Sequence, residues 1–365
     1  MGLSYMVYPG AHHTRFHHAL GCMHLMQKAI HILKYKGVEI APEEENGLLC
    51  AILLHDMGHG PFSHALEGSL IPGQRHERIS LLFMEVLNEE FGGELETALQ
   101  IFKGEHPKKY LNQLVSSQLD MDRLDYLKRD SFYTGVTEGN ISSERLITML
   151  NVAQNELVVE EKGLYSVEKF LMARRFMYWQ VYLHKTSLVA ELLLNKLMKR
   201  AKDLLNVGHE LPGPATLIEL LSNELSNFNR EHLPLFAQLD DVDVLSALKQ
   251  WQYHDDFILA DISKRLLNRD LLKIKIKNQP VSPHKLEERK KWVSINYPIQ
   301  SVEEDYYIFE GEIGHQAYNN RDQNIHILMK NGKLVDVAKA SDHFNLKALS
   351  KRVIKYYACY PKASV

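Results

Sequence analysis

The feature that most constrains the fold is an apolar run that ends in charge. The run Leu48–Leu54 leads directly into His55 and Asp56. Such a run predicts a helix that is buried on most sides, and an unpaired carboxylate at its end would be costly to bury. Asp56 is therefore expected to be protonated, ion-paired or bound to a metal. The alternative is a neutral core histidine beside an aspartate that caps the next segment.

Histidine is concentrated near this run. Ten of the 19 histidines lie in the first 76 residues, which is typical of a metal site or an acid–base site. Arg15 and His18 lie three residues apart and would share one face of a helix. An imidazole suits a transition metal, and a guanidinium suits a phosphate. The alternative is a histidine-rich start of a helix with solvated rings.

The segment Gln118–Asp130 carries the next group of acidic residues. Its apolar residues recur at helical spacing, so part of its charge is expected near the edge of the core. Asp122, Tyr126 and Asp130 are spaced to share one face, and Asp125 is expected to pair with Arg129. A carboxylate here would complete a metal site of two histidines and two aspartates. A solvated helix face with ion pairs is the alternative.

Another group of titratable residues follows the His55-Asp56 motif. His64, Glu67 and His76 are residue types that commonly transfer protons to a leaving oxygen. Each of them, taken singly, is more often a surface or capping residue. Together with the metal motif they indicate a hydrolytic site.

Composition narrows the class of protein. The 365 residues carry a net charge of −3, which gives no sign of a nucleic-acid-binding surface. No run approaches the ~20 apolar residues that span a bilayer. The three cysteines argue against a disulfide framework and fit a reducing compartment. We therefore expect a cytoplasmic protein.

The pattern of apolar residues changes along the chain. Residues 1–265 are expected to form a helical domain, and residues 266–365 a smaller α+β domain. In the second part, Leu271–Lys277 alternates apolar and basic residues as an edge strand does. Asn331-Gly332 between two apolar runs predicts a two-residue hairpin loop. A short hairpin is also expected from Asn155–Val167, inside the helical part.

These motifs, in this order, resemble those of the HD-domain phosphohydrolases. The strings "HHTRFHHALG", "HDMGHGPFSH" and "LDMDRLDYLKRD" carry the resemblance, which spans roughly residues 5 to 190. Within this family, the same strings more specifically resemble those of the deoxynucleoside triphosphate triphosphohydrolases of the SAM-and-HD-domain type. The fold implied is mainly α, a helical HD-domain bundle with a smaller C-terminal α+β region.

The resemblance also implies roles for individual residues. One divalent metal, whether Mn, Fe, Zn, Ni or Mg, is expected at the site. The metal ligands are His18, His55, Asp56 and Asp122; the catalytic residues are His59, His64, Glu67 and His76; the substrate-binding residues are Arg15, Tyr126, Arg129, Asp130, Arg174, Tyr182 and Lys185. The metal would neutralise Asp56.

The implied reaction is hydrolysis of a dNTP to deoxynucleoside and triphosphate. Alternatives are an HD-type nucleotidase or phosphodiesterase acting on another nucleotide, and a metal-dependent nucleotide sensor with little turnover. An effector nucleotide and a homodimer or homotetramer are further expectations from the resemblance. Glu67 stands where some relatives have Asp, and the chain begins almost at its first motif, which leaves effector binding open.

Overall fold

Helices dominate the computed structural model, which describes residues 1–71, 73–222, 228–319, 324–342 and 349–364. The side chain of His64 is also outside the description. The helices are α1 (Arg15–Tyr35), α2 (Pro42–Leu54), α3 (His76–Glu90), α4 (Glu96–Lys103), α5 (Lys109–Val115), α6 (Met121–Thr134), α7 (Ser143–Thr148), α8 (Leu164–Met177), α9 (Lys185–Asn206), α10 (Ala215–Ser222), α11 (Leu233–Phe236), α12 (Asp241–Trp251), α13 (Phe257–Leu267), α14 (Pro283–Asn296) and α15 (Val337–Ala340).

The strands form two small sheets. The strands are β1 (Leu150–Ala153), β2 (Glu156–Glu160), β3 (Lys273–Lys277), β4 (Phe309–His315), β5 (His326–Leu328), β6 (Leu334–Asp336) and β7 (Val353–Tyr360). One sheet has the order β1-β2-β5-β6 and the other the order β3-β7-β4. The expected fold class, mainly α with a C-terminal α+β region, is confirmed.

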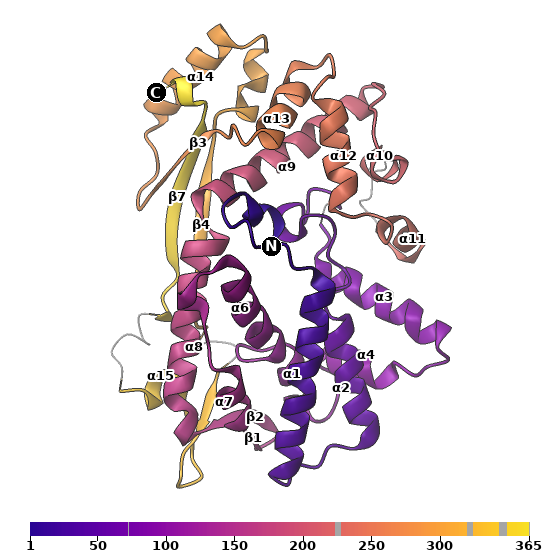
Figure 1. Ribbon diagram of the computed structural model, residues 1–365, viewed down its shortest axis with the longest axis vertical. Coiled ribbons are helices and arrows are strands. Elements are labelled where there is room, and N and C mark those ends of the chain that lie inside the picture. Colours follow the sequence, from indigo (N-terminus) through magenta and orange to yellow (C-terminus); the bar gives the residue numbers. More distant parts are fainter. Residues whose placement is uncertain (72, 223–227, 320–323, 343–348, 365) are drawn as a thin grey trace.

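The predicted buried helix is α2. Pro42 occupies its first turn, where a missing N–H costs nothing, and the side chains of Leu48, Ala51 and Ile52 are fully buried. α2 lies beside α1 and packs on α4, while α6 packs on the other side of α1 (Figure 1). The helix ends at Leu54, so His55 and Asp56 emerge at the end of a well-packed element.

Two apolar cores meet near this helix end. One core includes residues of α1, α2, α6 and α8, and the other includes residues of α9, α12 and α13. The loop after α2 passes from one core to the other, since Ile52 belongs to the first and Phe62 and Leu66 belong to the second. Groups on this loop are therefore held by packing at both ends.

The C-terminal residues are interleaved with the helical part. β5 pairs in parallel with β2, so one sheet joins residues from both sides of position 265. Ile327 and Val337 lie in the same core as α1 and α2. The proposed division into residues 1–265 and 266–365 remains a prediction. None of the described helices is long and apolar enough to cross a membrane.

Two expected hairpins exist in altered form. Asn331 and Gly332 do lie in the β5–β6 turn, but the turn closes with Gly332 N–H on the Met329 carbonyl and Gly332 at φ +79°, a three-residue loop instead of two. In the helical part, β2 pairs with the upstream strand β1, not with residues after Gly163. Gln154 and Asn155, both at positive φ, form that turn. The edge strand over 273–277 is confirmed as β3.

Candidate metal centre

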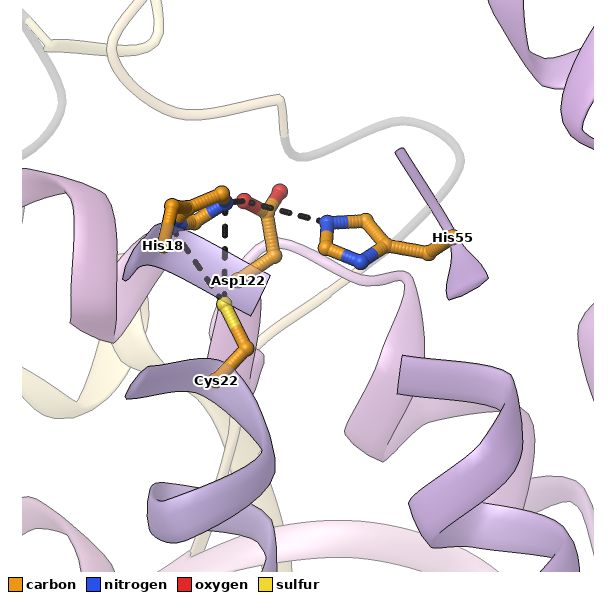
Figure 2. A group of neighbouring side chains, drawn as sticks. All are labelled: His18, Cys22, His55 and Asp122. Atoms are coloured by element: carbon orange, nitrogen blue, oxygen red, sulfur yellow. Dashed lines mark hydrogen bonds and ion pairs between the residues drawn. The ribbon is translucent and has the colours of Figure 1, made fainter. Parts of the chain in front are cut away.

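The side chains of His18, His55, Asp56 and Asp122 lie together, as the sequence predicts. His18 Nε2 lies 3.1 Å from Asp122 Oδ1, and His55 Nε2 lies 3.7 Å from the same oxygen. On the other side, Asp56 lies 3.4 Å from His55 Nε2 and 3.9 Å from His18 Nε2. Histidine and carboxylate thus alternate around a closed ring of four groups. Figure 2 shows His18, His55 and Asp122 converging from three separate elements.

Burial and close contact determine the charge of these groups. Burial by itself lowers the pKa of His18, but its bonds to Asp122 and Asp125 outweigh that and raise the pKa. Burial raises the pKa of Asp122, yet its hydrogen bond with His18 and the nearby ring of His55 hold the pKa well below its usual range. Asp56 behaves likewise, with His55 and Arg15 lowering its pKa against burial. Both carboxyls are therefore ionised, as metal ligands must be.

The donor atoms fit a divalent metal. His55 Nδ1–H donates to the Ile52 carbonyl at 2.6 Å, so Nε2 keeps its lone pair. That Nε2 is buried and accepts no hydrogen bond from any described residue. Two imidazoles and two carboxylates are a common donor set for first-row transition metals. An orphaned buried nitrogen facing two carboxylates is the arrangement that a metal would satisfy.

Cys22 is a further member of the cluster that the sequence analysis missed. Its Sγ lies 3.4 Å from His18 Nδ1, and the four atoms of His18, Cys22, His55 and Asp122 are close enough to share an ion (Figure 2). Burial raises the pKa of the Cys22 thiol to about 12. Because metals bind the thiolate, the ionised carboxylate of Asp56 is the better fourth ligand.

Asp125 orients the His18 ring, and the sequence analysis missed this role. His18 Nδ1–H donates to Asp125 Oδ2 at 2.7 Å, which leaves Nε2 directed at Asp122. Arg129 donates two hydrogen bonds to Asp125, of 2.8 and 2.9 Å. The pairing of Asp125 with Arg129 was expected from their i, i+4 spacing. That spacing does not show that Asp125 also orients His18, which lies on another helix. Arg129, expected to bind substrate, is engaged in this pair.

Two glycines leave room for close contacts at this site. A Cβ on Gly21 would lie 2.0 Å from Asp125 Oδ1 and 2.2 Å from Arg129 Nη2, so glycine leaves space on α1 for the Asp125–Arg129 pair. A Cβ on Gly58 would lie 2.1 Å from the His76 carbonyl oxygen. Gly58 N–H also donates to Ser80 Oγ at 2.9 Å. The "HDMGHG" loop is thereby pressed onto the start of α3.

Arg15 lies beside the ring of ligands. Its Nη1 donates to Asp56, and its Nε donates to Ser63 Oγ at 3.1 Å. Phe62 and Ser63 have φ of 52° and 54°, a region that residues other than glycine rarely adopt. Such strain is concentrated at functional sites. About a third of the Arg15 side chain remains exposed, which leaves the guanidinium accessible to an anion.

The expected catalytic residues lie on the other side of Asp56. His59 Nε2 is 3.6 Å from Asp56 Oδ1, and the rings of His59 and His76 stack at 3.8 Å. Glu67 Oε1 accepts hydrogen bonds from both His76 Nδ1 and the His76 backbone N–H, at 2.7 and 3.0 Å. All three side chains line a cavity that Phe236 also borders. The side chain of His64, the remaining expected catalytic residue, lies outside the described residues.

The expected sugar-binding residues form a second cluster. Tyr182 OH donates to Asp130 Oδ2 at 2.7 Å, and the rings of Tyr126 and Tyr182 meet edge to face at 6.2 Å. His13 Nε2 donates to the other oxygen of Asp130 at 2.7 Å. Sequence reasoning gave His13 no role, because a ring two residues before a helix has no fixed direction. Burial and the Asp130 charge raise the pKa of Tyr182 well above its usual range.

The remaining expected residues differ in placement. Arg174 lies near the end of α8, one turn before Tyr178, and its Nη1 donates to the Ala317 carbonyl at 3.3 Å. Lys185 is the exposed first residue of α9 and forms no hydrogen bond with a described member of the ligand ring. The structure therefore groups Arg174 with the cluster and leaves Lys185 at its edge.

Comparison with protein families gives two matches. Residues 15–130 match the HD domain, and residues 141–209 match an HD associated region. The first match begins at Arg15 and ends at Asp130, so it contains all four members of the ligand ring. The second contains Arg174 and Tyr182.

Three similar proteins show the range of relatives. A crystal structure of a phosphohydrolase from Bacteroides thetaiotaomicron is 48% identical, with a TM-score of 0.94 over 99% of this chain and 91% of that one. An uncharacterised protein of Bacillus subtilis, YwfO, is 29% identical over 93% of this chain and 79% of its own length. Human deoxynucleoside triphosphate triphosphohydrolase SAMHD1 is 28% identical over 57% of this chain and 40% of its own length.

Proposed function

Because this chain belongs to the HD-domain phosphohydrolase family, we propose that it hydrolyses dNTPs to deoxynucleoside and triphosphate. One observation carries the proposal: the closed ring of His18, Asp122, His55 and Asp56, with an orphaned histidine nitrogen inside it. The similarity to SAMHD1, whose name gives a dNTP substrate, supports this choice within the family.

We assign the metal ligands as His18, His55, Asp56 and Asp122. A divalent metal bound there supplies a Lewis acid for a phosphate oxygen and lowers the pKa of a bound water. Asp125 keeps the His18 proton on Nδ1, and the Ile52 carbonyl does the same for His55. With a metal bound, the chain would present two imidazole Nε2 atoms and two carboxylates in one place.

Other side chains would bind the triphosphate and move the proton. Arg15 and Arg174 offset the phosphate charge, and Arg15 needs only to exchange its contact with Asp56 for one with substrate. We propose His64 as the donor of a proton to the leaving 5′-oxygen. Glu67 fixes the orientation of His76, which stacks on His59 and binds the phosphate chain. Tyr182, held by Asp130, packs against the deoxyribose.

Several finer expectations are proposals of the same kind. We propose a homodimer or homotetramer, a cytoplasmic location and regulation by an effector nucleotide. Lys185 and Arg129 are weaker substrate ligands, since one is at the rim and the other is paired with Asp125. A nucleotidase acting on another nucleotide remains the second candidate, because the ring of ligands itself does not select the phosphate chain.

The test is a product analysis. Protein reconstituted separately with Mn, Fe, Zn, Ni or Mg would be incubated with each dNTP, with dGTP as activator, and with the matching NTPs and monophosphates. Anion-exchange chromatography separates deoxynucleoside, triphosphate and orthophosphate. Asp122→Asn removes one metal ligand, and Asp261→Asn, an aspartate of α13 that pairs with Arg265, is the matched control.

The outcomes separate the candidates. We expect deoxynucleoside and intact triphosphate from the wild type and the control, and no product from Asp122→Asn. Orthophosphate released from monophosphates alone would make the protein a nucleotidase. Absence of any product while metal is bound would favour a nucleotide sensor.

A further inference from the structure

A buried histidine from the C-terminal sheet lies against the substrate cluster. His315 is the last residue of β4, and its side chain is 7% exposed. Its ring stacks on Tyr178 at 3.7 Å with an interplanar angle of 16°. Tyr178 in turn contacts Tyr182 edge to face at 5.1 Å. A contiguous row of rings therefore runs from the proposed sugar-binding residues to His315.

The stacking partner belongs to an irregular segment. Tyr178–Tyr182 forms a single π-helical turn directly after α8. Such turns are often found at functional sites because they re-aim side chains. Here the turn brings both Tyr178 and Tyr182 to one side, and the Tyr178 ring fixes the plane of the His315 imidazole.

His315 has an unsatisfied polar atom. Its Nε2 is buried, and no described residue forms a hydrogen bond with it. Arg174 Nε is also buried without a hydrogen-bond partner among the described residues. Arg174 Nη1, in contrast, donates to the carbonyl of Ala317, two residues beyond His315. Two buried nitrogens without hydrogen-bond partners in the described part of the chain indicate a missing group, since such atoms are nearly always bonded. An acceptor would satisfy both of them when His315 carries its proton on Nε2.

The charge around His315 points to an anion. Arg174 and Arg175 lie close to it, and neither forms an ion pair with a carboxylate among the described residues. Burial, followed by the charges of these two arginines, lowers the pKa of His315 to about 4. The imidazole is therefore neutral, and it lies beside two arginines that have no ion-pair partner among the described residues. A phosphate would satisfy both donors and balance the charge.

We propose that His315 binds the terminal phosphate of the substrate together with Arg174, through its Nε2–H. The inference rests on the proposed function and deepens it: the C-terminal sheet supplies a positioning residue that reads the length of the phosphate chain. A monophosphate has no terminal phosphate beyond the scissile one, so His315 would add nothing to its binding. His315 would thus favour triphosphates over shorter chains.

Two substitutions separate the donor from the ring. His315→Phe keeps a flat ring on Tyr178 and removes the N–H, while His315→Gln keeps an N–H donor and removes the ring. His284→Ala, an exposed histidine of α14, is the matched control. Circular dichroism and thermal unfolding verify that each variant folds.

The direct measurement is titration calorimetry with inorganic tripolyphosphate. We expect His315→Phe to weaken tripolyphosphate binding about tenfold, the loss of one hydrogen bond to a charged group, with His315→Gln and His284→Ala close to wild type. In turnover of a dNTP, His315→Phe should raise KM by a similar factor and change kcat little. In the double variant that combines His315→Phe with Arg174→Lys, the affinity should fall by less than the product of the two single-variant factors, because both side chains hold one phosphate.

A failure of the His315 inference can be distinguished from a failure of the proposed dNTP hydrolysis. Tripolyphosphate binding by folded His315→Phe that equals the wild type, while the wild type releases triphosphate from a dNTP, would overturn this inference alone. A fall in kcat at constant KM would also overturn it. If the wild type neither binds tripolyphosphate nor releases it, the proposed function fails and the inference fails with it.

Discussion

At the residue scale, the orientation of His18 decides whether the four ligands can act as one site. The ring is fixed by Asp125, and Asp125 is fixed by Arg129. This is the arrangement in which a carboxylate behind a metal-binding histidine sets its tautomer and direction. The ligand type is visible in the sequence, but the residue that orients it comes from another helix.

Removal of the Asp125 charge should weaken metal binding without removing a ligand. We expect Asp125→Asn to lower the affinity for Mn²⁺ about tenfold to a hundredfold, because its amide cannot accept from both His18 and Arg129 as a carboxylate does. Calorimetric titration with Mn²⁺ measures this. Asp261→Asn breaks the equivalent i, i+4 pair with Arg265 and should leave Mn²⁺ affinity unchanged. Equal affinity in both variants would remove Asp125 from the site.

The pKa of His315 gives a prediction for stability against pH. Its pKa is about 4 in the folded chain and 6.5 for a free histidine. Between these values the unfolded chain binds the proton and the folded one does not, so the free energy of unfolding falls as pH drops from 6.5 toward 4. Urea unfolding at pH 7.5 and pH 5 should show a smaller loss for His315→Gln than for wild type. Parallel losses would mean that His315 titrates normally.

At the scale of elements, the loop after α2 depends on how closely it approaches α3. Gly58 is pressed against backbone atoms of His76 and Ser80, whereas a Cβ on Gly60 would meet side-chain atoms, the ring of Phe236 at 3.3 Å and Leu70 at 3.8 Å. A side chain can move away, whereas helix backbone cannot do so cheaply. A larger residue is therefore expected to be tolerated less well at Gly58 than at Gly60.

Substitution of these two glycines tests the packing. Gly58→Ala should cost about 1–3 kcal/mol of unfolding free energy and remove most activity, because the loop must leave α3 and carries Asp56 and His59 with it. Gly60→Ala should cost less and keep activity. Chemical denaturation and the triphosphate assay give both numbers. A larger loss for Gly60→Ala than for Gly58→Ala would contradict this account of the loop.

Elements differed in how well their sequences predicted them. α2 and the edge strand β3 follow from local patterns, the apolar run and the Lys-Ile alternation. The β5–β6 turn differs by one residue because Asn-Gly fits both a two-residue loop and a turn with a bulge. β2 was paired with the wrong neighbour, since a five-residue strand accepts either flanking segment and packing decides.

At the scale of the whole molecule, the site depends on contacts that are remote in sequence. The four proposed ligands come from α1, α6 and the end of α2, and the sequence motifs predicted that their side chains would lie together. His315 comes from β4, almost 200 residues after Asp122 by their sequence numbers, and no local pattern marks it. Its place follows only from the packing of the C-terminal sheet on α8 and the π-helical turn.

We propose that water attacks the α-phosphorus of a dNTP at the ring of His18, His55, Asp56 and Asp122. Hydrolysis in water enriched in oxygen-18, followed by mass spectrometry of the products, tests this proposal. We expect one labelled oxygen in the released triphosphate and none in the deoxynucleoside. Label in orthophosphate, with a deoxynucleoside diphosphate as the other product, would instead place the attack at the γ-phosphorus and overturn the proposal.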